Sequence, residues 1–352
     1  MNPIFLEDSL SLLRAMIRIP SLSHEEGAVA TLIEESLNTW GYKPYRDNNN
    51  VWLFSSNWKE DLPTILLDSH IDTVRPAKTW SYDPFGATEI DGKLIGLGSN
   101  DAGASVVSLL CAFRHLESKS QPYNLIFCAS AEEEISGLHG VTSVLEKFGK
   151  ISLAVVGEPT GMQMAVAEKG LVILDCESKG KTGHAARNEG ENAIYKALAD
   201  IQTLAGLTLP KTSGILGPVK ITVTQIEAGT QHNVIPDSCR FVVDVRTNEF
   251  YSNEEAFRII AEKIDAEVKP RSFRLNSSAI PLGHPLVQRG IALGLSHYGS
   301  PTTSDQAVSR VTSIKIGPGD SARSHTADEY IFLDEIRNGV EIYIQLLDQL
   351  QL

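Results

Sequence analysis

Residues 64–72 read TILLDSHID, a mostly apolar run that leads directly into aspartate and histidine. A short apolar run bounded in this way predicts a buried strand. Similar runs follow at 125–129, 153–156 and 314–316, and residues 101–119 have the pattern of a helix between two of them. Strands of this kind that alternate with helices are typical of an α/β layer around a largely parallel sheet. We therefore expect an α/β fold with residues 64–72 in its sheet.

The N-terminal segment predicts two helices. Apolar residues recur at helical spacing across 4–19, and Pro20 ends that pattern. Ser23 and Glu26 then have the spacing of a capping box, which predicts Ser23 as the N-cap of a second helix. That helix is expected to end near Gly41.

From residue 171 the pattern changes. The sequence now predicts strand, helix, strand, strand, helix and strand, at 171–178, 191–205, 219–227, 239–247, 253–265 and 267–274. That order is the split β-α-β unit of ferredoxin-like domains. The α/β pattern returns after about residue 280. We therefore expect one domain formed by residues 1–170 and 279–352, interrupted by a second domain at 171–278.

The charge balance narrows the classes of partner. Lys and Arg number 31 and Asp and Glu number 44, so the formal net charge is −13. Nucleic-acid binders usually carry a basic face because phosphate neutralisation supplies most of their affinity. The densest basic cluster here is only Lys179-Gly180-Lys181. The sequence argues against nucleic acid and membranes as partners, while a small anionic substrate can still bind beside a local cation.

The sequence predicts a cytoplasmic protein. The N-terminus MNPIFLED lacks the basic and apolar regions of a signal peptide. No run approaches the roughly 18 apolar residues of a membrane span. The four cysteines form no C-x-x-C pair and are expected to be buried, reduced thiols; they are Cys111, Cys128, Cys176 and Cys239.

Residues that can bind a metal follow four of the predicted buried strands. They are His70 and Asp72, Glu132-Glu133-Glu134, Glu158, and Asp320 with His325. Asp101 adds a carboxylate after the glycine-rich segment GLGSN at 96–100. In an open α/β sheet, ligands bind beyond the carboxyl ends of the strands. Imidazole and carboxylate ligands together suit zinc, cobalt or manganese.

Each of these residues taken singly has a structural interpretation. A histidine at a strand end can be a hydrogen-bonded structural residue, the Glu132–Glu134 run can be a solvated surface, and Asp101 can be a helix N-cap. Their coincidence favours a metal site, because adjacent carboxylates beside buried strands are costly unless they are paired or metal-bound.

Five segments together resemble the motif set of a large metalloenzyme family. They are HIDTV at 70–74, NDAG at 100–103, EEISG at 133–137, GEPT at 157–160 and SHT at 324–326. The family contains acetylornithine deacetylase, succinyl-diaminopimelate desuccinylase, aminoacylases and glutamate carboxypeptidase. The resemblance covers almost the whole chain, in the family's order and at its intervals. It implies a metal-binding α/β catalytic domain with an inserted dimerisation, or lid, domain.

The resemblance implies two divalent metal ions, with zinc as the default and cobalt or manganese as alternatives. By the family pattern, His70 and Glu158 hold one ion, Glu134 and His325 hold the other, and Asp101 bridges the two. These assignments are expectations carried over from the matching motifs.

The resemblance also implies features around these ligands. Asp72 would lie behind His70 and fix its tautomer and angle, and the i, i+2 spacing in an extended segment points both side chains the same way. The peptide after the bridging aspartate is cis in this family, so we expect a cis bond between Asp101 and Ala102. One departure is Leu97, where the family commonly has an arginine.

Glu133 is the residue expected to act as general base and acid. It would take a proton from the attacking water and pass it to the leaving amine. Because three glutamates stand in a row, a second register is open, with Glu132 as base and Glu133 as ligand. The Ile-Ser-Gly tail at 135–137 matches the family after its glutamate pair and favours Glu133 and Glu134.

The inserted domain carries two further matches. His184, in the segment TGHAA at 182–186, resembles the family histidine that reaches across a dimer and stabilises the oxyanion in the partner's active site. Its alternative interpretation is an ordinary loop residue. The NVIP segment at 233–236 implies that Asn233 contacts the substrate.

Three more residues have an implied role in substrate binding. Arg246, in the match DVR, would grip a free carboxylate with its guanidinium fork. The alternative for Arg246 is a strand-end salt bridge with Asp244. Lys169 and Thr303 lie in further matching segments with weaker support.

The resemblance implies hydrolysis of an N-acyl amide on an amino acid by a homodimer. The chain length and the GEPT segment favour N-acetyl- or N-succinyl-ornithine or -citrulline, in arginine biosynthesis. Succinyl-diaminopimelate desuccinylase and a dipeptidase or carboxypeptidase are alternatives of the same class. A non-catalytic metal-binding protein is the alternative from another class, and Glu133 argues against it, because a binder needs no spare carboxylate beside the ligands.

Overall fold

The computed structural model describes residues 3–187 and 189–352, which form two compact units. The first unit comprises residues 1–166, 279–298 and 304–352, and the second comprises 167–278 and 299–303. Residues 167–170 and 299–303 were expected in the first domain but lie in the second unit. Hydrogen bonds explain this placement: the Lys169 N–H donates to the Ser300 carbonyl at 3.0 Å, and the Gly170 N–H donates to the Thr247 carbonyl at 3.1 Å.

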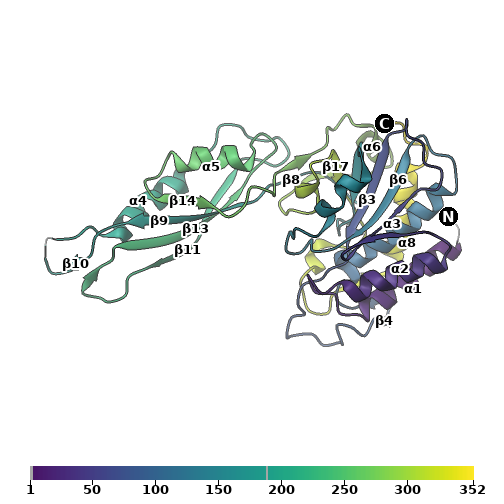
Figure 1. Ribbon diagram of the computed structural model, residues 1–352, viewed down its shortest axis with the longest axis horizontal. Helices are drawn as coiled ribbons and strands as arrows, with labels where there is room; N and C mark the ends of the chain where they lie inside the picture. The colour runs from purple at the N-terminus through teal and green to yellow at the C-terminus, as the bar shows by residue number, and fades with distance from the viewer. Residues whose placement is uncertain (1–2, 188) are drawn as a thin grey trace. The chain divides into compact units, whose positions relative to one another are not determined.

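A nine-stranded sheet forms the centre of the first unit (Figure 1). Its order is β1 (Tyr45–Asp47), β2 (Asn50–Phe54), β6 (Asn124–Ser130), β3 (Thr64–His70), β7 (Leu153–Val156), β17 (Ser313–Lys315), β8 (Met164–Glu168) and β15 (Ser278–Ala279), and β16 (His297–Ser300) pairs with β8. The four neighbours β6, β3, β7 and β17 are parallel. The predicted α/β class with a mostly parallel sheet is confirmed.

The central strands are buried on both faces, which explains their nearly continuous apolar runs. In β3, Ile65 and Leu67 face a large core shared with helices, while Leu66 faces a smaller core with Trp52 and Phe148. The helices of this unit are α1 (Pro3–Ile17), α2 (Gly27–Thr39), α3 (Ala104–Glu117), α6 (Pro285–Ala292), α7 (Gln306–Ser309) and α8 (Leu333–Leu347), with short turns η2 (Val141–Ser143) and η3 (Leu145–Phe148). Helix α3 packs between α1 and α8.

The first unit also contains a small three-stranded sheet. It has the order β18 (Tyr330–Phe332), β5 (Lys93–Ile95) and β4 (Thr88–Ile90). Two short turns, η1 (Ser99–Gly103) and η4 (Ser321–Arg323), contact each other nearby. Turn η1 contains Asp101 of the predicted metal site, and η4 ends two residues before His325.

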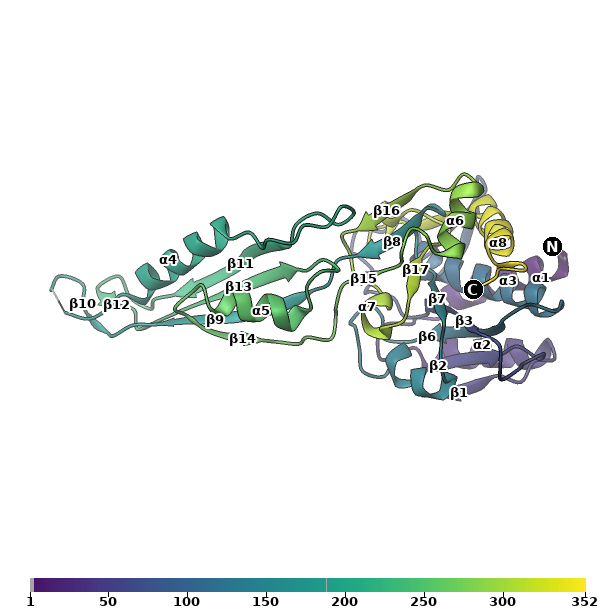
Figure 2. The same ribbon diagram turned by 90° about the horizontal axis from the view of Figure 1, so that it is seen from above.

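The second unit is a four-stranded antiparallel sheet with two helices on one face (Figures 1 and 2). The sheet order is β11 (Lys220–Ala228), β13 (Ser238–Arg246), β9 (Val172–Lys179) and β14 (Glu267–Pro270), and the helices are α4 (Ala193–Gly206) and α5 (Asn253–Ala261). Alternate residues of β9 and β13, such as Leu174 and Phe241, form a core with both helices. This is the predicted split β-α-β arrangement, with a shorter last strand. A small ladder of β10 (Gly183–His184) and β12 (Val234–Ile235) extends the unit.

The structure also bears on the predictions about the cysteines and about membrane-spanning helices. All four cysteines are buried and free of disulfides, as predicted. Among the helices of the described residues, none has the length and apolar character that crossing a membrane requires.

Candidate metal centre

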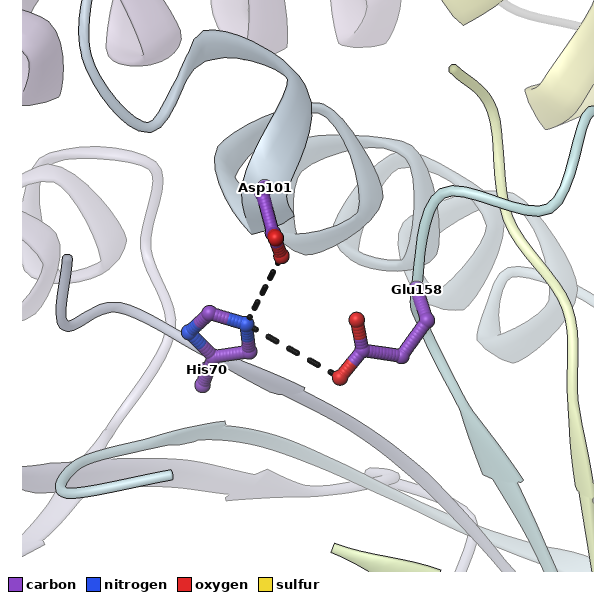
Figure 3. A group of neighbouring side chains, drawn as sticks. All are labelled: His70, Asp101 and Glu158. Atoms are coloured by element: carbon purple, nitrogen blue, oxygen red, sulfur yellow. Dashed lines mark hydrogen bonds and ion pairs between the residues drawn. The ribbon is translucent and has the colours of Figure 1, made fainter. Parts of the chain in front are cut away.

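His70 and Glu158 meet at the carboxyl ends of two neighbouring parallel strands. The register pairs Asp68 of β3 with Val156 of β7, so residues 70 and 158 stand side by side two positions further on. His70 Nε2 lies 3.8 Å from Glu158 Oε1 and 3.2 Å from Asp101 Oδ1 (Figure 3). Asp101 comes from η1, at the start of α3. One ligand atom from each of the three residues lies within 4.8 Å of the others, close enough to share one metal ion.

A second trio forms on the other side of Asp101. His325 Nε2 lies 3.0 Å from Glu134 Oε2 and 3.7 Å from Asp101 Oδ2. The two carboxylate oxygens of Asp101 therefore face different imidazoles, Oδ1 toward His70 and Oδ2 toward His325. The structure thus brings together all five predicted ligands in two trios that share Asp101.

The electrostatics of the two trios fit a cationic occupant. Burial, together with the charges of nearby carboxylates, raises the pKa of Glu158 to about 8. Burial and the charge of Glu158 also raise the pKa of Glu133 well above its usual range. Burial lowers the pKa of His70, but hydrogen bonds to Asp101 and Asp72 outweigh it and raise that pKa. Crowded carboxylates with two imidazoles form the donor set that divalent ions such as zinc prefer.

Asp72 is fully buried and contacts both His70 and the backbone of Glu133 and Glu134. His70 Nδ1 lies 3.0 Å from the Asp72 backbone carbonyl and 3.5 Å from its Oδ1. Asp72 Oδ1 accepts the Glu133 N–H at 3.0 Å, and Oδ2 accepts the Glu134 N–H at 3.1 Å. Asp72 therefore contacts the ring of the predicted ligand His70, and its carboxylate holds the backbone of two adjacent glutamates.

Ser23 contacts this carboxylate, and its predicted role as an N-cap is wrong. Helix α2 begins at Gly27 with Glu26 as its N-cap, while the Ser23 hydroxyl donates to Asp72 Oδ2 at 2.7 Å. The hydroxyl is used by a residue 49 positions away, so it does not cap the nearby helix. The local sequence pattern carries no signal for that contact.

The three consecutive glutamates point in different directions. Glu132 has a positive φ of 57°, and its carboxylate contacts His24 Nδ1 at 2.9 Å and the His139 N–H at 3.0 Å. Glu134 faces His325, while Glu133 Oε2 lies 4.0 Å from His70 Nε2 and belongs to neither trio. This arrangement favours the register with Glu133 as base and Glu134 as ligand.

The turn that carries Asp101 has two further features. The peptide between Asp101 and Ala102 is cis, as expected. The buried carboxylate of Glu329 accepts backbone N–H groups of this turn, a contact that the sequence patterns did not predict.

The predicted substrate residues lie in the second unit. His184 in β10 pairs with Val234 in β12, and the Ala185 N–H donates to the Asn233 carbonyl at 3.0 Å, so His184 and Asn233 are brought together. Arg246 ends β13 and forms a two-point salt bridge with Asp244, at 2.8 and 3.0 Å, which is the geometry of its alternative interpretation.

The other two predicted substrate residues lie at the ends of the second unit's two chain segments, Lys169 near the start of 167–278 and Thr303 at the end of 299–303. Lys169 Nζ donates to the Pro218 carbonyl at 3.0 Å. Thr303 is half-buried in the segment 299–303.

The chain matches the model of peptidase family M20/M25/M40 over residues 66–349. A succinyl-diaminopimelate desuccinylase of Cereibacter sphaeroides is 29% identical over 273 residues, which cover 73% of this chain and 72% of the relative. A desuccinylase of the same name from Parvibaculum lavamentivorans is 26% identical over 387 residues, covering 98% and 96%.

Solved structures share the fold over nearly the full length. The aminopeptidase PepT of Bacillus cereus has a TM-score of 0.78 at 18% identity, with 98% of each chain covered. The YXEP protein of Bacillus subtilis, described as a dinuclear metal binding peptidase, has a TM-score of 0.73 at 17% identity, covering 99% of this chain and 100% of that one. The chain therefore belongs to peptidase family M20/M25/M40, a family of metallohydrolases that act on amide bonds.

Proposed function

We propose that this protein hydrolyses the amide bond of an N-acyl amino acid with two divalent metal ions, zinc by default. His70, Asp101 and Glu158 would hold one ion, and Asp101, Glu134 and His325 the other. The observation that carries the proposal is the shared Asp101, whose two oxygens face the two histidines at 3.2 and 3.7 Å. Glu133 Oε2 lies 4.0 Å from His70 Nε2 and is a carboxylate that neither trio requires.

Glu133 is placed to move the proton that amide hydrolysis requires. When bound, the two ions would lower the pKa of a water and polarise the acyl carbonyl. The Glu133 carboxylate takes a proton from the attacking water and later gives it to the leaving amine. Its burial favours the protonated form in the second half of this cycle. Asp72 fixes the backbone of Glu133 and the ring of His70 at the same time.

An N-succinyl diamino acid is the substrate class that the relatives favour. The curated relatives reported above are named succinyl-diaminopimelate desuccinylases. Those names support the desuccinylase alternative better than the expected role in arginine biosynthesis. We therefore propose N-succinyl-diaminopimelate as the first substrate to test, with the acylated ornithines and citrullines as the comparison group.

A homodimer would complete the site under this proposal. The motif match implies that His184 of one protomer stabilises the oxyanion in the other, and its exposed position on β10 is compatible with that role. Arg246 would bind a substrate carboxylate through the Nη1 edge of its guanidinium, because Asp244 occupies Nε and Nη2.

A substrate screen of the zinc-loaded protein tests the proposal. Amine release is measured from N-succinyl-diaminopimelate, from N-succinyl and N-acetyl forms of ornithine and citrulline, and from dipeptides, with Glu133→Gln as the matched control. We expect release from an acylated amino acid that Glu133→Gln abolishes. Release from dipeptides alone would replace the proposal with a peptidase activity. Two bound zinc ions without any release would support the non-catalytic alternative.

A further inference from the structure

We infer that Glu329 is a positioning residue that sets the affinity of the ion site formed by Asp101, Glu134 and His325. The inference rests on the proposed function, because it takes the two trios as ion sites. It adds a residue that binds no ion and contacts no substrate.

Glu329 holds the turn that carries the shared ligand. Its Oε1 accepts the N–H groups of Asn100 at 2.8 Å and Asp101 at 2.9 Å, and its Oε2 accepts the Gly98 N–H at 3.1 Å. Glu329 is 2% exposed, so these bonds form away from bulk water. Bonds from backbone N–H groups to a buried carboxylate are among the stronger hydrogen bonds in proteins.

His325 lies in the segment 320–329. Glu329 is the C-terminal end of this segment, and a second contact, made by Asn100, holds its N-terminal end at Asp320. The Asn100 side chain donates to the Asp320 carbonyl at 3.1 Å and accepts the Asp320 N–H at 3.0 Å. Gly319 has a φ of +91°, and a Cβ there would lie 2.3 Å from Asn100 Oδ1. The close approach therefore requires glycine at this position. Residues 320 and 329 are thus both fixed to the Asp101 turn, and His325 lies between them in the sequence. We call these two sets of contacts, made by Glu329 and by the Asn100 side chain, the clamp.

The two ion sites depend on this clamp to different degrees. His325 lies on a loop, has a positive φ of 59°, and its side chain is 55% exposed. His70 is the last residue of β3, and Glu158 follows β7 by two residues, so the sheet holds both of them. Loosening the clamp would separate His325 from Asp101 and so disrupt the second site, whereas the first site would keep His70 and Glu158 and feel only the shift of the shared Asp101.

Glu329→Gln is the variant that tests the clamp. If the glutamine carbonyl accepts the N–H groups of Asn100 and Asp101, its amide N–H₂ faces the Gly98 N–H. Two donors then face each other, and the Gly98 N–H loses its acceptor; the opposite orientation leaves the N–H groups of Asn100 and Asp101 without one. The matched control is Asp200→Asn in the second unit. Asp200 is also a buried carboxylate, and it accepts the N–H groups of Asp265 at 3.0 Å and Ala266 at 3.1 Å.

The experiment is a calorimetric titration of the chelator-treated full-length protein with Zn²⁺. We expect wild type and Asp200→Asn to bind two equivalents with the same two affinities. We expect Glu329→Gln to keep the first affinity within about threefold and to lose about 10–100-fold in the second, the range for residues that support metal ligands. Asn100→Ala removes the other half of the clamp and should show the same selective loss, so it serves if Glu329→Gln does not fold.

The outcomes separate this inference from the proposed function. Wild type that binds fewer than two equivalents contradicts the two-ion proposal itself. Wild type with two equivalents, and Glu329→Gln or Asn100→Ala with both affinities unchanged or equally reduced, overturns the clamp alone.

Discussion

Replacing Asp72 with asparagine should lower both the stability of the protein and its affinity for zinc. The carboxylate accepts the N–H groups of Glu133 and Glu134 on different oxygens, and it lies beside His70. Burial raises its pKa, but its interactions with His70 and Ser23 and with the Glu133 N–H outweigh burial, so the pKa lies below its usual range. Asp72 is therefore an ionised group that asparagine cannot replace.

The expected magnitude follows from the contact geometry. Whichever oxygen becomes the amide nitrogen will face a backbone N–H of Glu133 or Glu134 and leave that donor without an acceptor. An unsatisfied buried donor costs about 1–3 kcal/mol, so the free energy of unfolding should fall by that amount. Loss of the charge behind His70 should lower zinc affinity by about 10–100-fold.

Ser23→Ala is the matched control for this prediction. It removes the 2.7 Å bond from the Ser23 hydroxyl to Asp72 but leaves both backbone acceptors in place, so it should cost only about 0.5–1.5 kcal/mol. Urea unfolding of the metal-free proteins measures stability, and zinc titration measures affinity. The reasoning is refuted if Asp72→Asn costs no more stability and no more zinc affinity than Ser23→Ala.

Three other predictions concern the same centre. Glu133→Gln should retain both zinc ions and lose about 10²–10⁴-fold in kcat, whereas Glu132→Gln should lose far less; the reverse order of kcat values would restore the other register. In chelator-treated protein, burial raises the pKa of Glu158 to about 8, above its usual 4.5, so the folded state holds a proton that the unfolded chain releases. The thermal midpoint of the chelator-treated protein should therefore be lower near pH 8 than near pH 6, and Zn²⁺ should reduce the difference between the two midpoints. An equal or higher midpoint at pH 8 contradicts this. If His184 acts across a dimer, mixing inactive Glu133→Gln and His184→Ala chains should restore up to about a quarter of wild-type activity, since each mixed dimer has one intact site; no recovery after subunit exchange would place His184 in its own protomer's site or in none.

The meeting of the five predicted ligands could be expected from the sequence, because short motifs mark each of them and several follow apolar runs. His70 and Glu158 each come just after a short apolar run that predicts a buried strand, and neighbouring parallel strands bring their carboxyl ends to one edge. The strand predicted at 171–178 corresponds to β9, whose residues alternate between buried and more exposed positions.

The supporting residues could not be predicted because their partners are remote in sequence. Ser23 has the local spacing of an N-cap, yet its hydroxyl bonds to Asp72. Glu329 follows His325 without any pattern of its own, and the Asp101 N–H that it accepts lies 228 residues earlier. Segment 299–303 was misplaced for the same reason, because its backbone contact is with Lys169.

Anomalous diffraction at the zinc edge from crystals of the zinc-loaded protein tests the central claim most directly. The account predicts two zinc peaks, one beside His70 and Glu158 and one beside Glu134 and His325, with one oxygen of Asp101 bound to each. A single peak, or two peaks that do not share Asp101, would contradict it.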